Sequence, residues 1–180
     1  MKIITRINKA IELIEKYVLI FGMILLAFIT VGNAISRRFF NESWSFGEEA
    51  SLFIIVIVTF LGISYAARKG RHIRMTALFD QLPDNIQRLL MIFITATTSI
   101  VLFYLTYHSL IFTITMQSRG RVTPALQVPY YLVVMWVPIG LFLGAIQYLF
   151  AMIKNIKEDE AWLSYETKTD YIDHDIDVGV

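Results

Sequence analysis

Two adjacent carboxylates, Glu48 and Glu49, lie at the edge of a long apolar segment in the stretch W-S-F-G-E-E-A-S-L-F, residues 44–53. Carboxylates in such a place could couple a proton or a cation to transport, because ionisable groups near membrane segments often mark ion paths. They could also only complete a helix end. Ser45 and Glu48 have the S-x-x-E spacing of a capping box, in which each side chain accepts the other residue's backbone amide. Both carboxylates would also lie at the positive end of the following helix's dipole.

Three neighbouring residues favour the structural interpretation. Trp44 is of the type that anchors helices at a membrane interface. Arg37 and Arg38 close the preceding apolar segment and are expected on the same side of the membrane as the two glutamates. A salt bridge between these groups would tie the first two helices together. We therefore predict a structural role for Glu48 and Glu49, with ion coupling as the alternative.

Other reactive side chains are few. His108, in Y-L-T-Y-H-S-L-I-F, is the only titratable residue besides tyrosines that lies well within an apolar segment. A b-type haem usually needs two axial histidines at matching depths on facing helices. His72 lies in a basic connection and not in a span, so the sequence does not support a haem site. His174 in the acidic tail is too isolated for a metal site. The absence of cysteine excludes thiolate sites and disulfides. We therefore predict no catalytic residues, no metal and no cofactor held by this chain, and no enzymatic activity.

The composition indicates a membrane protein. Hydrophobic residues make up 56% of the 180 residues, and the mean hydropathy is +0.58, well above the usual range for a soluble domain. The net charge of +1 gives no indication of a nucleic-acid partner.

Four uncharged segments are long enough to cross a hydrocarbon core of about 30 Å, which needs about 20 helical residues. Pro124 and Pro129 disfavour a helical conformation for the residues that precede them, at the start of the fourth segment. We therefore expect the fourth membrane-spanning helix to begin near Tyr130. The prediction is an all-α integral membrane protein with a membrane domain over residues 17–153. Its expected spans are residues 17–36, 50–67, 89–112 and 130–153.

Lysine and arginine counts predict the orientation, because cytoplasmic flanks hold the excess of these residues. Residues 1–16, the connection 68–88 and the start of the tail together hold eleven, whereas the opposite side holds four. Both termini are therefore expected in the cytoplasm.

Two polar segments have the pattern of interfacial helices. In residues 1–16 the isoleucines share one helical face and the lysines lie on the other, which is typical of a helix in the headgroup plane; a soluble extension of the first span is the alternative. The same geometry recurs over about 73–88, where Pro83 breaks the run. Residues 154–180 carry three lysines and eight acids and are expected to form an acidic cytoplasmic tail, disordered or docked on a partner.

A stand-alone four-helix channel or small carrier, as a monomer or a dimer, is the rival functional hypothesis. Carriers of known architecture tend to contain internal repeats or spans broken at matching positions in two halves. Pro138 and Gly140 can kink the fourth span, but the first two spans have no counterpart and no convincing repeat is present. The pattern therefore favours a subunit over an autonomous carrier.

The order of several motifs resembles a known family. N-A-I-S-R-R-F-F closes the first span, W-S-F-G-E-E opens the second, and A-A-R-K-G-R-H-I-R-M closes it. T-P-A-L-Q-V-P and W-V-P-I-G accompany the fourth span. Over residues 10–155 the chain is similar to the small membrane subunit of tripartite ATP-independent periplasmic (TRAP) transporters, the DctQ-like family.

This resemblance implies a noncatalytic subunit of the bacterial inner membrane. Its expected partners are a large membrane subunit that carries sodium and substrate, a periplasmic substrate-binding protein, and membrane lipid, with bound phospholipid as a plausible ligand. The small subunit would brace the scaffold of the large one. The substrate would be an organic acid of the sialic acid or dicarboxylate class, although a subunit that does not line the substrate site says little about which one.

The resemblance also suggests roles for particular residues. Trp44, Glu48 and Glu49 would contact the partner or fix the subunit's own helix pair. Arg68, Arg71 and His72 would lie at the cytoplasmic lip and bind lipid phosphate or partner carboxylates, unless they are only the ordinary positive-inside signal. The segment from Thr123 through Pro124 to Pro129 would form the periplasmic entry to the last helix, under the docked binding protein.

Overall fold

The computed structural model describes residues 2–69 and 83–157, and these residues are almost entirely helical. The helices are α1 (Lys2–Phe40), α2 (Ser45–Lys69), α4 (Asp84–Ser118), α5 (Tyr131–Val134) and α6 (Trp136–Lys157). Four stretches of them are long and apolar enough to cross a membrane: Asn8–Phe40, Ser45–Lys69, Ile86–Ser118 and Tyr131–Lys157. The predicted all-helical fold with four helices of membrane-spanning length is therefore confirmed.

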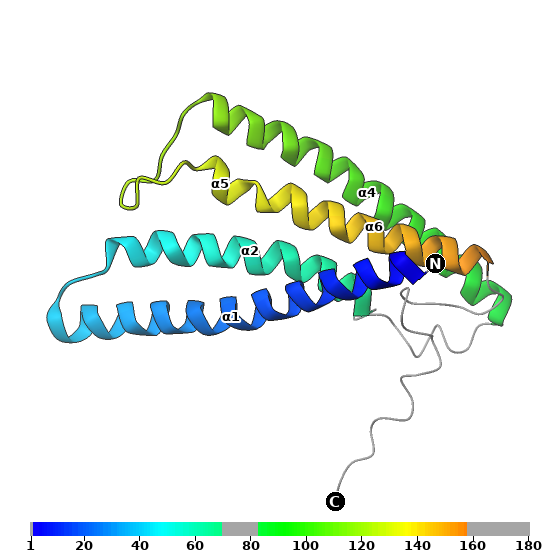
Figure 1. Cartoon of the computed structure of the whole chain (residues 1–180), viewed down its shortest axis with the longest axis horizontal. Helices are drawn as coiled ribbons and strands as arrows, with labels where there is room; N and C mark the ends of the chain where they lie inside the picture. Colours follow the sequence, from blue (N-terminus) through cyan, green and yellow to red (C-terminus); the bar gives the residue numbers. More distant parts are fainter. Residues whose placement is uncertain (1, 70–82, 158–180) are drawn as a thin grey trace, which may run out of the picture.

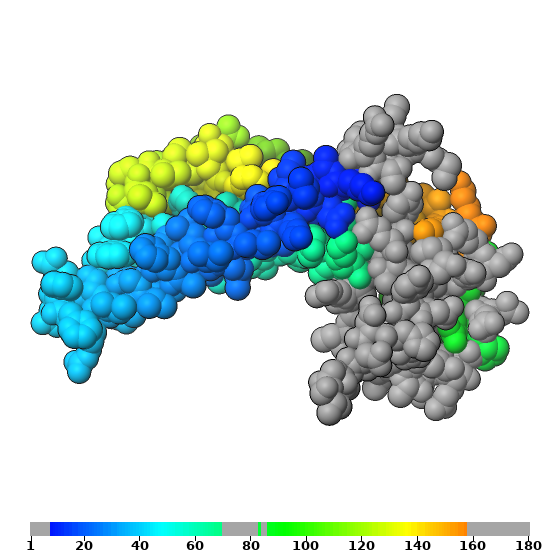
Figure 2. All heavy atoms as spheres, turned by 60° about the horizontal axis from the view of Figure 1, so that its bottom comes forward, coloured from blue at the N-terminus to red at the C-terminus, as the bar shows by residue number. Residues whose placement is uncertain are grey.

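The long helices form a single layer in the order α1, α2, α6, α4 (Figure 1). α2 packs between α1 and α6, and α6 packs between α2 and α4. We call the two ends of this layer the Arg68 end, where α2 finishes, and the Glu49 end, where α2 begins. Figure 2 shows α1 along the near side of the layer, with much of its surface uncovered by the other described helices. Large apolar side chains of α1 are exposed, such as Phe21 at 68% and Phe28 at 70%.

Small residues set the spacing between the central helices. A Cβ at Gly140 of α6 would overlap the backbone carbonyl of Phe60 in α2. A Cβ at Gly22 of α1 would lie 2.7 Å from the Val58 side chain of α2. Between α4 and α6, the Ser99 hydroxyl donates a hydrogen bond of 3.2 Å to the carbonyl of Ala145. The layer is thus held by close helix contacts of the kind that membrane helices make through small residues.

The boundary predicted between residues 16 and 17 is not a helix end, because α1 is one continuous helix of 39 residues. At 1.5 Å per residue it is about 58 Å long, roughly twice the hydrocarbon thickness. Residues 2–16 therefore continue the first span as the same helix. Their predicted location in the headgroup plane stays a prediction.

The later boundaries differ from expectation in simple ways. α4 begins directly after Pro83, so residues 84–88 belong to it, whereas residues 73–82 of the predicted interfacial segment lie outside the described residues. α4 also continues to Ser118 instead of ending near 112.

The predicted kink near Pro138 takes the form of an interruption at Met135, which separates α5 from α6. Residues 154–157 complete α6, and the rest of the predicted tail lies outside the described residues.

Candidate functional site

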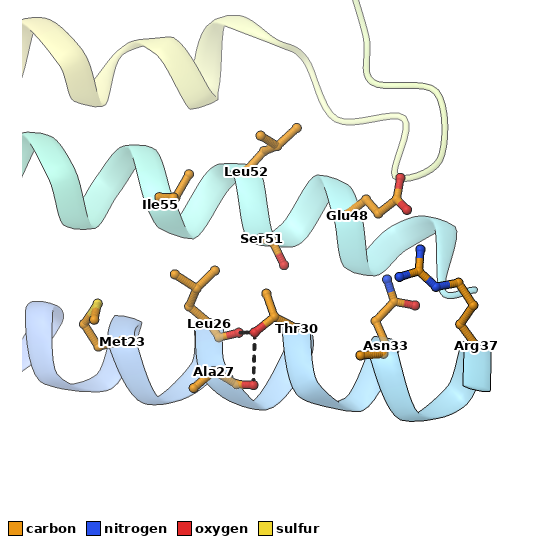
Figure 3. Close-up of a pocket in the computed structure, with 11 residues that line it drawn as sticks. Met23, Leu26, Ala27, Thr30, Asn33, Arg37, Glu48, Ser51, Leu52 and Ile55 are labelled. Carbon is orange, nitrogen blue, oxygen red and sulfur yellow. Dashed lines mark hydrogen bonds between the residues drawn. The ribbon is translucent and has the colours of Figure 1, made fainter. Parts of the chain in front are cut away.

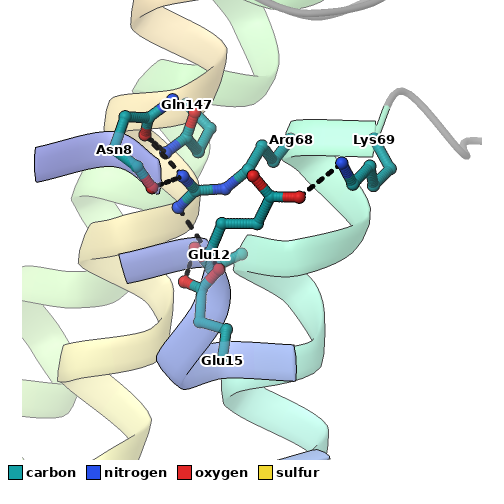
Figure 4. A network of polar contacts seen from close by, with 7 residues as sticks. Asn8, Glu12, Glu15, Arg68, Lys69 and Gln147 are labelled. Carbon is teal, nitrogen blue, oxygen red and sulfur yellow. Dashed lines mark hydrogen bonds and ion pairs between the residues drawn. The ribbon is translucent and has the colours of Figure 1, made fainter. Parts of the chain in front are cut away.

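A buried polar cluster joins three helices at the Arg68 end (Figure 4). The Arg68 guanidinium has no exposed surface. Its Nη1 donates to Asn8 Oδ1 of α1 at 2.6 Å and to the Asn8 carbonyl, and its Nη2 donates to Glu15 Oε2 at 3.2 Å. The Ser64 hydroxyl donates to Glu15 Oε1 at 2.6 Å, and Gln147 Nε2 of α6 donates to Asn8 Oδ1 at 3.0 Å. We call these five residues the Arg68 cluster.

The cluster compensates most of the cost of burying a charge pair, and among its buried polar atoms only Arg68 Nε and Gln147 Oε1 have no hydrogen-bond partner in the described part of the chain. Each buried ion loses several kcal/mol of hydration, which is recovered only if the partner is close and the remaining polar atoms are bonded. Both carboxylate oxygens of Glu15 accept a hydrogen bond, and both terminal nitrogens of Arg68 donate one. A second, half-buried ion pair between Lys69 and Glu12 lies beside the cluster. The polar side of α1 is therefore bound to α2 and α6.

This arrangement corrects the predicted role of Arg68. We expected Arg68 at an exposed lip, available to lipid phosphate or to carboxylates of a partner, but it is fully buried and paired within the chain. Arg71 and His72, the other two residues of that predicted lip, lie outside the described residues.

The partners of Arg68 were not predicted from the sequence. Asn8, Glu12 and Glu15 are spaced by four and three residues, so they share one face of α1. Ser64 and Arg68 are four apart and share a face of α2 in the same way. This spacing shows that the polar residues share a helical face, but it does not show that the face packs on α2, because the isoleucines of the same segment are equally compatible with a helix at the membrane surface.

At the opposite end, Glu49 joins α2 to the loop between α4 and α5. Its carboxylate accepts the backbone amides of Ala125 at 2.7 Å and of Leu126 at 2.8 Å, one on each oxygen. The loop is closed on itself, since the Thr123 amide donates to the Val128 carbonyl at 2.9 Å and the Val128 amide donates to the Thr123 hydroxyl at 3.1 Å. We call this the Glu49 contact. It unites two predicted site regions, the glutamate pair and the segment from Thr123 to Pro129.

The start of α2 is fixed by other means than the predicted capping box. Ser45 is the first residue of α2, and the described residues show no hydrogen bond between its hydroxyl and the Glu48 amide. The Trp44 amide instead donates to Asn33 Oδ1 of α1 at 2.8 Å. The Trp44 ring packs over Gly32, where a Cβ would lie 3.1 Å away. Trp44 therefore joins α1 to the start of α2.

The predicted salt bridge between the first two helices is not formed at this end. Within the described part of the chain, neither Arg37 nor Arg38 makes an ion pair with Glu48 or Glu49. Glu48 is exposed, and Glu49 is bound to the loop. The ion pairs that do tie α1 to α2 lie at the Arg68 end.

His108 lies on the outer side of α4 and is exposed. Its ring contacts those of Tyr104 and Tyr107, with centroids 4.4 and 5.4 Å apart. It follows Ser99 by nine residues, about two and a half turns towards the Glu49 end, which places it within the apolar length of the layer. None of the hydrogen bonds among the described residues involves the imidazole. A polar group within the hydrocarbon region of a membrane is expensive to leave without a hydrogen-bond partner.

The described ranges contain no group of three or more histidine, cysteine or acidic side chains that could hold a metal ion. The polar groups that converge are instead those of the Arg68 cluster and the Glu49 contact. The Arg68 cluster binds three helices to one another, and the Glu49 contact binds α2 to the loop between α4 and α5.

Comparison with known families gives one match that covers most of the chain. Residues 16–158 match the family described as the DctQ component of tripartite ATP-independent periplasmic transporters.

Three relatives illustrate the range of similar proteins. The ectoine TRAP transporter small permease protein TeaB of Halomonas elongata is 40% identical over 98% of this chain and 91% of its own length. The isethionate TRAP transporter permease protein DctMQ of Oleidesulfovibrio alaskensis is 26% identical over 75% of this chain, a match that spans 22% of the relative. The C4-dicarboxylate TRAP transporter small permease protein DctQ of Vibrio cholerae is 24% identical over 47% of this chain and 37% of its own length.

Proposed function

The chain belongs to the DctQ family of small membrane subunits of TRAP transporters, multi-pass proteins of the bacterial inner membrane, and from this premise we propose that it works as a rigid brace for a large transport subunit. TRAP small subunits work with a large membrane subunit and a substrate-binding protein. In this proposal the chain has no catalytic role. Solute and sodium pass through the partner.

The observation that carries the proposal is the pair of polar contacts at the two ends of the layer. The Arg68 cluster binds α1, α2 and α6 to one another. The Glu49 contact binds α2 to the loop that connects α4 with α5. The Arg68 cluster holds α1, α2 and α6 in fixed register, and a subunit that moved these helices relative to one another would have to break buried charged hydrogen bonds in each cycle. A fixed layer suits a brace.

A covalently joined relative supports the pairing with a large subunit. The isethionate protein DctMQ contains a region similar to this chain within a permease of which that region is about a fifth, 22%. We propose that this chain reaches the same arrangement by association with a separate large subunit. The proposed orientation places both termini, and with them the Arg68 end, in the cytoplasm, so that the loop at Thr123, Pro124 and Pro129 faces the periplasmic binding protein.

The proposed substrate is a small organic solute that carries an acidic group. The relatives' names include ectoine, isethionate and a C4-dicarboxylate, all of which contain a carboxylate or a sulfonate. Ectoine is the first solute to test, because the ectoine relative is 40% identical over nearly the full chain. Sialic acid, which the sequence motifs suggested, has no support from these names and comes later in the series.

The test is to express the tagged chain in its native host, purify it in mild detergent, and assay transport after reconstitution with and without the proteins that co-purify. We expect a stoichiometric large membrane protein. We also expect uptake only when that protein, the binding protein and a sodium gradient are all present.

Two results would contradict this proposal in different ways. Uptake by the chain alone would establish a stand-alone carrier and return Glu48, Glu49 and His108 to consideration as coupling residues. Uptake by the full complex without a sodium gradient would leave the brace role intact and overturn the proposed driving ion.

A further inference from the structure

A groove lies between α1 and α2 towards the Glu49 end (Figure 3). It has a volume of about 640 Å³. It begins next to Gly22, where a Cβ would lie 2.7 Å from the Val58 side chain of α2, and continues along the two helices to Arg37 and Glu48. Its walls are mostly apolar and include Leu26, Ala27, Leu52 and Ile55.

The one hydroxyl contributed to the wall by α1 is already used within the helix. The Thr30 hydroxyl donates to the carbonyls of Leu26 at 2.7 Å and Ala27 at 3.2 Å (Figure 3). It therefore needs no ligand, and this stretch of the groove offers an apolar surface suited to a hydrocarbon chain.

The mouth of the groove is polar and carries both signs of charge. Arg37 of α1 and Glu48 of α2 lie at the same end, together with the Asn33 side chain (Figure 3). Asn33 Oδ1 is occupied by the Trp44 amide, which leaves the Asn33 NH₂ group as a donor at the mouth. Among the described residues, neither Arg37 nor Glu48 has an ion-pair partner. The mouth thus offers two donor groups for an anion and one carboxylate for a cation.

The length of the groove matches one leaflet of a membrane. The lining residues of α1 run from Met23 to Arg37, which is about 21 Å along the helix at 1.5 Å per residue. Half of a bilayer that is about 40–45 Å thick with its headgroups is about 20–22 Å. The polar mouth lies at the helix end, where headgroups are expected, and the apolar end lies towards the middle of the membrane.

We propose that this groove is a binding site for a phospholipid with a primary ammonium in its headgroup. The lipid phosphate contacts Arg37 and the Asn33 NH₂ group, and the ammonium contacts Glu48. One acyl chain lies against Leu26 and Leu52. Arginine suits this role because its planar fork of donors matches phosphate oxygens. Neither charged residue takes part in the contacts that fix the helices, whereas Asn33 does so through its Oδ1, which accepts the Trp44 amide.

The test uses the full-length protein, with any large subunit that co-purifies, in nanodiscs made of equal parts phosphatidylethanolamine and phosphatidylglycerol. Native mass spectrometry after transfer to detergent measures the lipid that stays bound. We expect retained phosphatidylethanolamine in the wild type and about tenfold weaker retention in Arg37→Gln, the loss expected for one charged hydrogen bond. Glu48→Gln should remove the preference for phosphatidylethanolamine. Arg38→Gln, which alters an exposed arginine outside the groove, should match the wild type.

A second pair of variants tests the apolar part. Ala27→Phe places a ring in the groove and should displace the lipid, whereas Val31→Phe alters an exposed position of the same helix outside the lining and should not. Equal losses in Arg37→Gln and Arg38→Gln, or equal retention of both lipids by the wild type, would overturn the proposal. So would a photocrosslinking amino acid at Leu52 that captured polypeptide instead of lipid, because a helix of the partner would then occupy the groove.

Discussion

Arg68 of α2 and Glu15 of α1 form an ion pair inside the protein, with Nη2 3.2 Å from Oε2 and with 0% and 2% of their side chains exposed. They are far apart in the sequence, so the pair forms only when α1 lies against α2 in the correct register. The same guanidinium holds Asn8, which in turn binds Gln147 of α6. One arginine therefore determines how three helices meet.

Replacing Arg68 with leucine should destabilise the protein strongly. The change leaves the buried Glu15 carboxylate without its cation, and loss of one member of a buried pair typically costs about 3–5 kcal/mol. Thermal unfolding in detergent, followed by tryptophan fluorescence, measures the effect. Arg38→Leu, at an exposed arginine without an ion pair among the described residues, is the control and should change stability little.

The double variant Glu15→Leu/Arg68→Leu separates charge from packing. With both charges removed, no buried ion is left unpaired, so the double variant should be more stable than Arg68→Leu alone. A double variant as unstable as the sum of the two single variants would show that the pair does not interact as the structure describes.

Glu49→Gln should loosen the loop between α4 and α5. A glutamine side chain has one acceptor oxygen, whereas the Glu49 carboxylate accepts the amides of Ala125 and Leu126 on two oxygens. Hydrogen exchange at these two amides should become faster. Glu48→Gln removes the neighbouring exposed carboxylate and should leave both amides unchanged. If the proposed brace role is correct, Glu49→Gln should also leave the sodium dependence of transport by the complex unchanged.

Gly140→Ala should separate α2 from α6. The new Cβ would overlap the Phe60 carbonyl, and overpacking of this kind typically costs about 1–3 kcal/mol. Gly62→Ala is the matched control, because its Cβ would meet only Leu19 Cδ2 at an ordinary 3.7 Å. Alanine also favours helix over glycine by about 1 kcal/mol. We therefore expect Gly62→Ala to have equal or higher stability than the wild type in the same unfolding assay.

His108→Leu should have opposite effects on the chain and on the complex. The exposed imidazole lies at an apolar depth, so its removal should stabilise the isolated chain. If the large subunit supplies its hydrogen-bond partner, the complex should lose about 1 kcal/mol of association energy, as membrane interhelical hydrogen bonds typically contribute. The amount of large subunit that co-purifies measures this loss.

A photocrosslinker places the same interface directly. At Tyr104, which is 63% exposed beside His108, it should capture the large subunit. At Phe28 on the α1 edge it should capture lipid. Capture of a second copy of this chain from Tyr104 would contradict the predicted contact.

The membrane-spanning helices were predictable because length and uncharged composition alone decide which segments can cross a bilayer. Trp44 and Glu49 were also identified as residues at a helix start, since interfacial tryptophan and acidic residues have general preferences there. Their partners were not. Glu49 binds backbone amides, and every non-proline residue has one, so no side-chain pattern could identify Ala125 and Leu126.

The Arg68 cluster shows a different limit. Arg68 follows the second apolar segment directly, and in the sequence it is indistinguishable from arginines that only mark the cytoplasmic side. Its burial depends on α1 extending as an unbroken helix far enough to bring Asn8 and Glu15 to it. The length of α1 depends on tertiary packing and cannot be predicted from the local pattern alone. A segment with isoleucines on one face and lysines on the other is equally compatible with a separate surface helix.

The order of helices within the layer also bears on how the protein is made. α1 packs on α2, and α4 packs on α6, which follows it after the short α5, so each pair forms a helical hairpin. The hairpins meet along the seam between α2 and α6, where Gly140 lies against Phe60. Each hairpin can therefore enter the bilayer and form its own contacts during synthesis, and the seam closes only after the last helix has left the ribosome. Assembly of the finished subunit then waits on a single late docking step between two preformed halves.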